Sequence, residues 1–201
     1  PWCFVGLARL KTLAEEYNIS VTDRAFLLRP DTPEEGVERQ QRPGELPGQL
    51  SGDLQAIAEA AGLTEMKRPD RRPNSLKALQ AVEHAKGLGK NDELRDALYA
   101  AYWEQKRDVG QIDVLQDIAE SVGIEWAPLE LALKTNLYLD TIMEEYQDGM
   151  DNGFNGIPAF IIGDVKFTGA QPMELFRQLA DRAKAMLEKD PKAFDDIRRV
   201  L

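Results

Sequence analysis

The sequence predicts an α/β fold in which a long helical segment separates a short β-containing beginning from a ββα end. Two observations support this class. Near the carboxyl end, two runs rich in β-branched and aromatic residues, 159–162 and 165–168, flank Gly163-Asp164, which is a two-residue hairpin signal. Between about residues 50 and 150, apolar residues recur at helical spacing, and no strand pattern interrupts them.

The chain begins with a predicted helix from Cys3 to Tyr17, whose apolar residues fall on one face and whose stop signal is Asn18. Cys3 is the only cysteine and lies in the first turn, where backbone amides and the helix dipole stabilise anions and a reactive thiolate is favoured. A lone cysteine at a helix start is more often a small buried hydrophobe. Position alone therefore leaves both roles open.

Residues 19–28 predict a strand with a bend near Asp23, because the parity of the apolar residues changes there. Arg29-Pro30 ends it. Residues 31–52 are polar and rich in proline and glycine, which predicts an unusually long loop. Loops of this length are functional or disordered, and we favour a flap over an active site, since the loop leaves the predicted strand at the end where such a site would lie.

The middle of the chain predicts a series of helices. Three of them stop at Gly62, Gly87 and Gly123, and Pro128 opens a further helical stretch that reaches about Asn152. The carboxyl-terminal module follows. Proline has no amide hydrogen for a β-ladder, so Pro158 is expected at the first position of its strand. Pro172 stands where a first-turn proline opens the last helix.

Composition excludes several classes of function. The chain has 201 residues, 35 acidic and 25 basic, and a net charge of −10, without a basic block that would follow a phosphate backbone. We therefore expect no nucleic-acid partner. No apolar run approaches the roughly 20 residues that span a bilayer, so we expect no membrane association either. His84 is the only histidine and has no second ligand at metal-binding spacing, so no metal site is expected.

One basic cluster and one aromatic group are candidates for binding. The cluster, Lys67, Arg68, Arg71 and Arg72, would suit an acidic peptide or the carboxylates of glutathione, although a solvated loop is the commoner outcome. The aromatic group, Tyr99, Tyr102 and Trp103, would suit a substrate groove, although its helical spacing favours core packing.

Five segments, in order along the chain, resemble one known family. The segment 1–6, Pro-Trp-Cys-Phe-Val-Gly, resembles the tail of the Cys-Pro-Trp-Cys active site of DsbA-like thioredoxin-fold proteins, especially the FrnE-like branch. Segment 156–160, Gly-Ile-Pro-Ala-Phe, resembles their cis-proline loop, and 167–172 resembles their last strand and the start of the helix after it. Segments 73–78 and 101–103 resemble parts of their helical insertion. The first cysteine of the motif is absent from this sequence.

The resemblance implies a thioredoxin-like fold with a large all-helical insertion, whose first strand is missing from this chain. We expect residues 1–50 and 151–201 to form the thioredoxin-like domain, and residues 51–150 to form the insertion. We also expect residues before Pro1 to supply a strand of roughly five to ten residues that ends in cysteine. Without that strand, the predicted strand 19–28 and the first hairpin strand would be left as unpaired edges.

The function that the resemblance implies is thiol-disulfide oxidoreduction. Cys3 would take the resolving role, Pro1 and Trp2 would tune the redox potential, and the backbone of Ile157 before a cis Pro158 would pair with an extended substrate. The expected catalytic residues are Pro1, Trp2, Cys3 and Pro158, and the expected substrate-binding residues are Gly156 and Ile157.

We expect protein or small-molecule thiols and disulfides as substrates, and no cofactor apart from glutathione as a co-substrate. A homodimer is compatible with the resemblance, and a cytoplasmic location is expected unless a signal precedes Pro1. Two alternatives stay open. One is a glutathione-dependent isomerase or transferase of the kappa-class or hydroxychromene-carboxylate isomerase branch, which resembles Ser-Pro-Tyr at this site. The other is a redox-inert binding or chaperone-like module.

Overall fold

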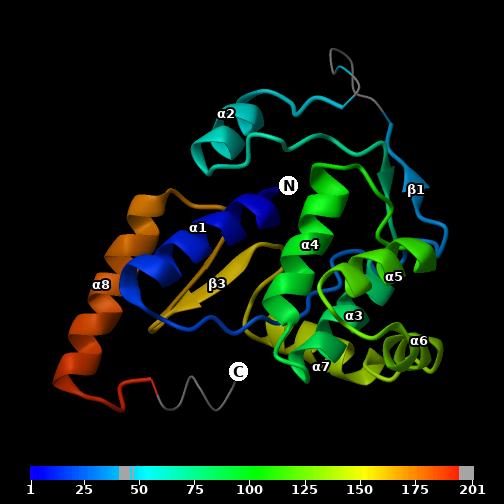
Figure 1. Cartoon of the computed structure of the whole chain (residues 1–201). Coiled ribbons are helices and arrows are strands. Elements are labelled where there is room, and N and C mark those ends of the chain that lie inside the picture. Colours follow the sequence, from blue (N-terminus) through cyan, green and yellow to red (C-terminus); the bar gives the residue numbers. More distant parts are fainter. Residues whose placement is uncertain (41–45, 47, 195–201) are drawn as a thin grey trace. The chain divides into compact units, whose positions relative to one another are not determined.

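The computed structural model describes residues 1–40, 46 and 48–194 (Figure 1). The chain divides into two compact units, of which the first comprises residues 1–24 and 147–201 and the second residues 25–146. Residues 25–50, which the sequence analysis assigned to the thioredoxin-like part, lie in the second unit. The Ala25 amide donates a hydrogen bond to the Glu145 carboxylate, and the Phe26 ring lies 4.9 Å from the Tyr146 ring, centroid to centroid.

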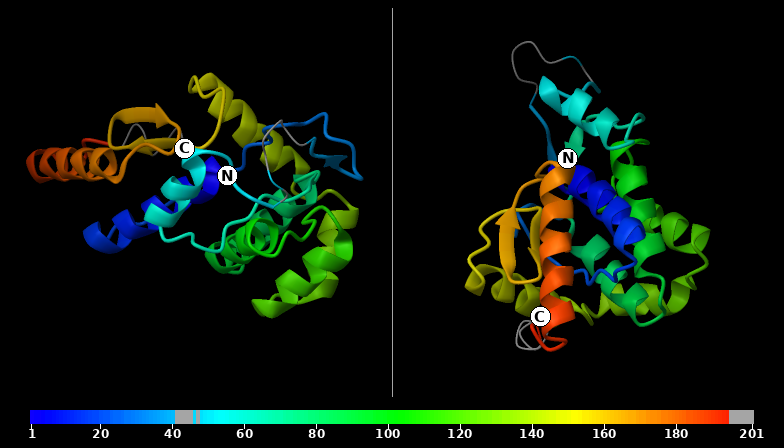
Figure 2. Two further views of the ribbon diagram at one scale, coloured as in Figure 1. Left: turned by 90° about the horizontal axis from the view of Figure 1, so that it is seen from above. Right: turned by 90° about the vertical axis from the view of Figure 1, so that its left-hand side faces the viewer.

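The described part of the first unit contains one antiparallel hairpin, two complete helices and the end of a third helix (Figures 1 and 2). In chain order its elements are α1 (Trp2–Tyr17), β3 (Ala159–Ile162), β4 (Val165–Thr168) and α8 (Met173–Lys189). Ala159 pairs with Thr168 and Ile162 with Val165, and Gly163 has a φ of 62° in the turn between the strands. The predicted hairpin and the start of the last helix after Pro172 are therefore confirmed.

One face of the hairpin carries the core of this unit. Side chains alternate across a strand, so Phe160 shares its face with Ile162 and with its cross-strand partner Phe167. Fully buried Phe176 of α8 meets both of these phenylalanine rings edge-on, at centroid distances of 5.0 and 5.3 Å. Leu13 of α1 completes the cluster, so both helices pack on the same side of the hairpin.

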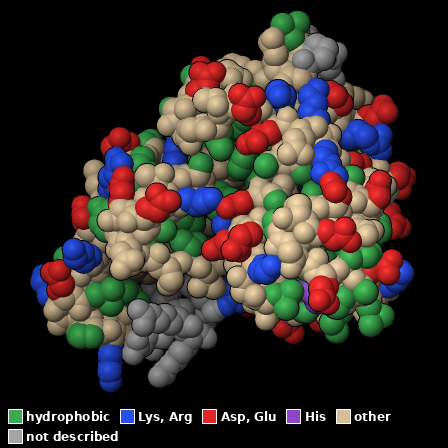
Figure 3. Space-filling view, in the orientation of Figure 1, with side chains coloured by type: hydrophobic (Ala, Val, Ile, Leu, Met, Phe, Trp, Pro, Cys, Tyr) green, Lys and Arg blue, Asp and Glu red, His purple; other side chains and the backbone are tan. Residues whose placement is uncertain are grey.

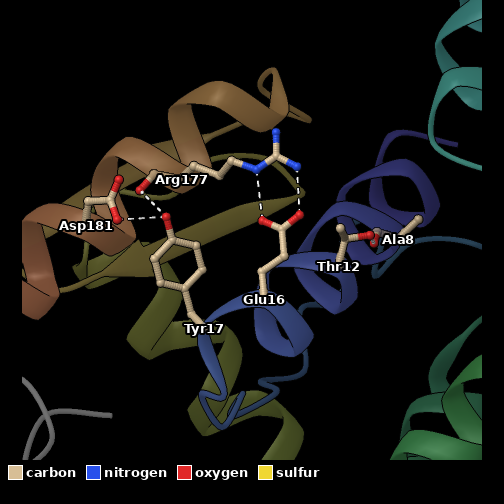
Figure 4. Close-up of polar contacts among 6 residues, drawn as sticks. All are labelled: Ala8, Thr12, Glu16, Tyr17, Arg177 and Asp181. Atoms are coloured by element: carbon tan, nitrogen blue, oxygen red, sulfur yellow. Dashed lines mark hydrogen bonds and ion pairs between the residues drawn. The ribbon is translucent and has the colours of Figure 1, made fainter.

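Side-chain hydrogen bonds join the carboxyl-terminal half of α1 to α8 (Figure 4). Both oxygens of the Glu16 carboxylate accept hydrogen bonds from the Arg177 guanidinium, at 2.9 and 2.7 Å. The Tyr17 hydroxyl donates to Asp181 at 2.8 Å. One turn earlier, the Thr12 hydroxyl donates to the Ala8 carbonyl of its own helix, at 3.2 Å. The bonds from Glu16 and Tyr17 to α8 hold the end of α1 that is remote from Cys3.

The second unit is mainly helical, as predicted for the insertion. Its elements are β1 (Val37–Glu38), α2 (Asp53–Ala60), β2 (Arg71–Arg72), α3 (Leu76–Lys86), α4 (Asn91–Trp103), α5 (Ile112–Ser121), α6 (Trp126–Lys134) and α7 (Leu139–Asp151), the last of which continues into the first unit. Its core comes from α3 to α6 and includes Ala81, Leu94, Leu115, Ile118 and Leu129. In the described ranges, no helix is both long and apolar enough to cross a bilayer.

The predicted strand at residues 19–28 is wrong, because no strand forms there in the described part of the chain. The segment has no ladder partner among the described residues, and Ile19 and Val21 are 43 % and 38 % exposed. One of its backbone donors, the Ala25 amide, is satisfied by the side chain of Glu145 instead. A run with strand composition thus stays irregular where no described strand lies beside it.

Two further predictions need correction. The helical stretch predicted from Pro128 to Asn152 is two helices, α6 and α7, because Asn136 takes the left-handed conformation, with a φ of 51°. The insertion also contains the short strand β2, although its sequence, Arg71-Arg72, has no strand pattern. Pairing with β1 and a hydrogen bond from the Tyr102 hydroxyl to the Arg71 carbonyl hold it in place.

The predicted loop 31–52 begins with an anchored segment. The Asn74 amide donates to the Thr32 carbonyl at 2.7 Å, and β1 pairs with β2. The Arg39 guanidinium donates to the Tyr102 hydroxyl at 2.8 Å and lies 5.6 Å from the Trp103 ring centroid. Residues 32–39 are therefore tied to the helical unit, and the flap over an active site stays a prediction. Residues 41–45 and 47 lie outside the described part.

Candidate active site at the start of α1

The first turn of α1 carries three of the predicted site residues. The helix begins at Trp2. The first hydrogen bond of the helix runs from the Val5 amide to the Pro1 carbonyl, at 3.1 Å. Cys3 is half-buried, and Trp2 is 42 % exposed. Residues 2–5 include no carboxylate that would oppose the field of the helix dipole. This setting favours a negatively charged sulfur over one in mid-helix.

Gly6 brings this part of α1 against the head of the hairpin. A Cβ atom at Gly6 would lie 3.1 Å from Cγ of Pro158 and 2.9 Å from Cζ of Phe160, closer than ordinary contact. Cys3 and Gly6 are three residues apart and are therefore neighbours on the helix surface. Only a residue without a side chain lets the helix approach so closely. The structure thus places Pro158 beside the amino-terminal turns of α1.

The loop that leads into β3 has the predicted form. The Ile157–Pro158 peptide bond is cis, and Pro158 is buried immediately before the first strand residue. The Pro158 carbonyl accepts a hydrogen bond from the Gly169 amide at 2.8 Å, which ties it to the loop after β4. An added Cβ at Gly156 would meet nothing within 4 Å, so packing does not require glycine there.

Arg9, one turn beyond Gly6, is hydrogen-bonded to the loop that follows β4. One terminal nitrogen of its guanidinium, Nη1, donates to the carbonyls of Ala170 and Gln171, at 2.5 and 2.6 Å. Burial lowers the pKa of Arg9, and the negative charge of Glu174 partly offsets this effect. An arginine remains charged in proteins, so both hydrogen bonds are charge-assisted.

Sequence reasoning singled out neither Gly6 nor Arg9. Gly6 did leave a signal, because a glycine inside a helix costs roughly 0.5–1 kcal/mol relative to alanine and so suggests a close approach of another element. Arg9 left none. Its partners are 161 and 162 positions away, and nothing in the local pattern distinguishes it from an exposed helix arginine.

The basic cluster at residues 67–72 is largely engaged. Arg71 forms ion pairs with Glu38 and Asp108, at 3.6 and 3.8 Å, and donates to the Glu35 carbonyl. Lys67 lies 4.0 Å from Glu65. Figure 3 shows basic side chains interspersed with acidic ones on the face that it presents. These contacts explain Arg71 as part of the framework around β2 and give Lys67 a carboxylate partner.

The other candidates also have structural roles. Tyr102 and Trp103 form an edge-to-face pair at 5.0 Å that supports Arg39. The His84 ring lies edge-on to Tyr138, with Nδ1 at 3.4 Å from the hydroxyl, and burial lowers the pKa of His84. Among the described residues, no group of three or more histidine, cysteine or carboxylate side chains is placed to hold a metal ion.

Comparison with known proteins identifies relatives over most of the chain. The family model of the DSBA-like thioredoxin domain matches residues 1–181. YwbO of Bacillus subtilis (strain 168), described as an uncharacterized protein, is 27 % identical over 188 residues, which is 92 % of each protein. The crystal structure of the probable DsbA oxidoreductase SCO1869 from Streptomyces coelicolor has a TM-score of 0.77 and 23 % identity, with 92 % of this chain and 86 % of that one covered. At this identity, the structural likeness establishes the fold.

Proposed function

Because this chain belongs to the DsbA-like thioredoxin family, we propose that it is a thiol-disulfide oxidoreductase that reacts through Cys3. The observation that carries the proposal is the contact of Gly6 with Pro158 and Phe160. This contact brings the only cysteine, on the preceding turn, to the side of α1 that faces the head of the hairpin. This arrangement supports a site in which the Cys3 sulfur exchanges near an edge that takes an extended substrate.

The chemistry at Cys3 is one exchange step. Its thiolate attacks one sulfur of a disulfide, a new sulfur–sulfur bond forms, and the other sulfur leaves as a thiolate, so there is no net oxidation. The helix start stabilises the attacking or leaving anion. In the complete motif that the resemblance implies, a preceding cysteine attacks the substrate and Cys3 resolves the mixed disulfide. Pro1 and Trp2 then surround the reacting sulfurs and tune their potential.

The substrate side of the site is the loop before β3. The backbone of Ile157, with Gly156 before it, pairs with an extended segment of a protein or small-molecule disulfide, and Pro158 supports that segment. Glutathione serves as a co-substrate through its thiol. The family membership and the place of Cys3 support this assignment.

Reaction of the purified chain with oxidised glutathione tests the proposal. The wild-type protein should gain one glutathionyl group, detected by mass spectrometry and reversed by a reducing agent, and its alkylation rate should rise at lower pH than that of a small free thiol. Cys3→Ser removes the only thiol and is the matched control. Glutathione bound without a covalent adduct would favour the isomerase or transferase alternative. A thiol with ordinary alkylation and no adduct would favour the redox-inert module.

A further inference from the structure

We propose that Arg9 is a positioning residue for disulfide exchange at Cys3. Its guanidinium holds residues 169–172, the loop between β4 and α8, against α1, and this β4–α8 loop in turn holds Pro158. The inference rests on the proposed function and assigns a role in it to a residue that the sequence analysis did not identify.

A short chain of hydrogen bonds links Arg9 to Pro158. Arg9 donates to the carbonyls of Ala170 and Gln171, and the neighbouring Gly169 amide donates to the Pro158 carbonyl at 2.8 Å. The Gln171 amide also donates to the Gly169 carbonyl at 2.9 Å, which closes a tight turn. Movement of the turn away from α1 would therefore draw the Pro158 backbone with it.

Arg9 and Gly6 constrain the same loop in complementary ways. Gly6 sets how closely α1 approaches Pro158 and Phe160, because no side chain separates them. Arg9 pulls the β4–α8 loop towards the same helix by two charge-assisted bonds. Since Cys3, Gly6 and Arg9 succeed one another at three-residue intervals, the sulfur and both constraints lie on adjoining parts of the helix surface.

The far end of α1 supplies a control. The bonds between Glu16 and Arg177 join α1 to α8, and they lie at the opposite end of α1 from Cys3. If Arg9 only stabilises the packing of the helices, then loss of Arg9 and loss of Arg177 should have equivalent effects. If Arg9 positions the loop for substrate, only its loss should slow the reaction of an extended substrate.

The experiment compares two disulfides with the same leaving group. One is 5,5′-dithiobis(2-nitrobenzoate), and the other is an extended peptide whose single cysteine is in a mixed disulfide with thionitrobenzoate. In both reactions Cys3 forms a new disulfide and releases thionitrobenzoate, which is followed by absorbance. Only the peptide reaction requires the loop, because the small reagent has no backbone to pair with it.

In Arg9→Met, the rate constant for the peptide should fall by about tenfold or more, since a displacement of about 1 Å can cost on the order of 100-fold. The small reagent should react within about twofold of the wild-type rate. Arg9→Lys, which keeps the charge and can reach one carbonyl, should recover part of the peptide rate. Arg177→Met should leave the ratio of the two rates unchanged.

Folding of each variant is checked by circular dichroism, and hydrogen exchange of the Gly169 amide reports the loop directly. If Arg9→Met does not fold, Arg9→Lys carries the test, and an unchanged rate ratio with unchanged Gly169 protection overturns the inference. Equal slowing of both reagents also overturns it, because Arg9 would then act on the sulfur itself. If the wild type reacts with neither disulfide, it is the proposed function that fails.

Discussion

Replacing Gly6 with alanine tests the close approach on which the site depends. The new Cβ would lie 2.9 Å from Phe160 and 3.1 Å from Pro158, while ordinary contact begins at 3.4 Å. The helix and the hairpin would therefore have to separate by about half an ångström. Phe160 cannot turn aside easily, because its ring is packed against the Phe167 and Phe176 rings at 5.2 and 5.0 Å.

Two opposing contributions set the change in the free energy of unfolding that Gly6→Ala causes. Alanine in place of glycine stabilises a helix by roughly 0.5–1 kcal/mol, whereas overpacking costs about 1–3 kcal/mol. The overpacking cost is the larger of the two, so Gly6→Ala should lower the free energy of unfolding by about 1 kcal/mol. For a chain of this size, that corresponds to a fall of about 2–4 °C in Tm. Chemical denaturation and thermal unfolding of the purified variant measure both quantities.

Gly87→Ala is the matched control. Gly87 follows α3 with φ −63° and ψ −18°, and an added Cβ would meet only the His84 carbonyl, at 3.5 Å. Alanine fits there, so this variant should gain about 0.4–1 kcal/mol through a less flexible unfolded chain. If Gly6→Ala gains stability as Gly87→Ala does, α1 does not approach the hairpin as closely as described, and the reasoning about the site is refuted.

Two other predictions concern charged contacts. The Lys86 ammonium lies 2.6 Å from the Glu83 carboxylate and 3.3 Å from the Glu145 carboxylate, and both carboxylates are nearly buried. Lys86→Met should therefore lower the free energy of unfolding, measured with denaturant, by about 3 kcal/mol. A loss near zero would show that the two carboxylates need no cation. The Arg177 hydrogen bond lowers the pKa of Glu16, so its stabilisation is present above the ordinary value of 4.5 and is lost as the pH falls through the lower folded pKa. Glu16→Gln should therefore be less sensitive to acid than the wild type in pH-dependent unfolding, and an identical acid profile would contradict this.

Local signals predicted the elements whose conformation depends on nearby residues. The hairpin follows from Gly163-Asp164 between two runs of strand-forming residues, because the turn geometry needs a positive φ that glycine adopts readily. Helix stops at Gly62 and Gly123 follow for the same reason, with φ values of 81° and 73°. The position of Cys3 in a first helical turn was also predictable.

The sequence by itself therefore determined the hairpin, the helical character of the middle of the chain and the place of Cys3 in a first helical turn, while tertiary contacts decided which segments pair and how α1 is held against the hairpin. Residues 19–28 have strand composition but no ladder partner among the described residues, whereas Arg71-Arg72 lacks it and pairs with β1. The constraints from Gly6 and Arg9 join residues more than 150 positions apart. Such contacts depend on the packing of complete elements, and a pattern read over a few turns does not contain them.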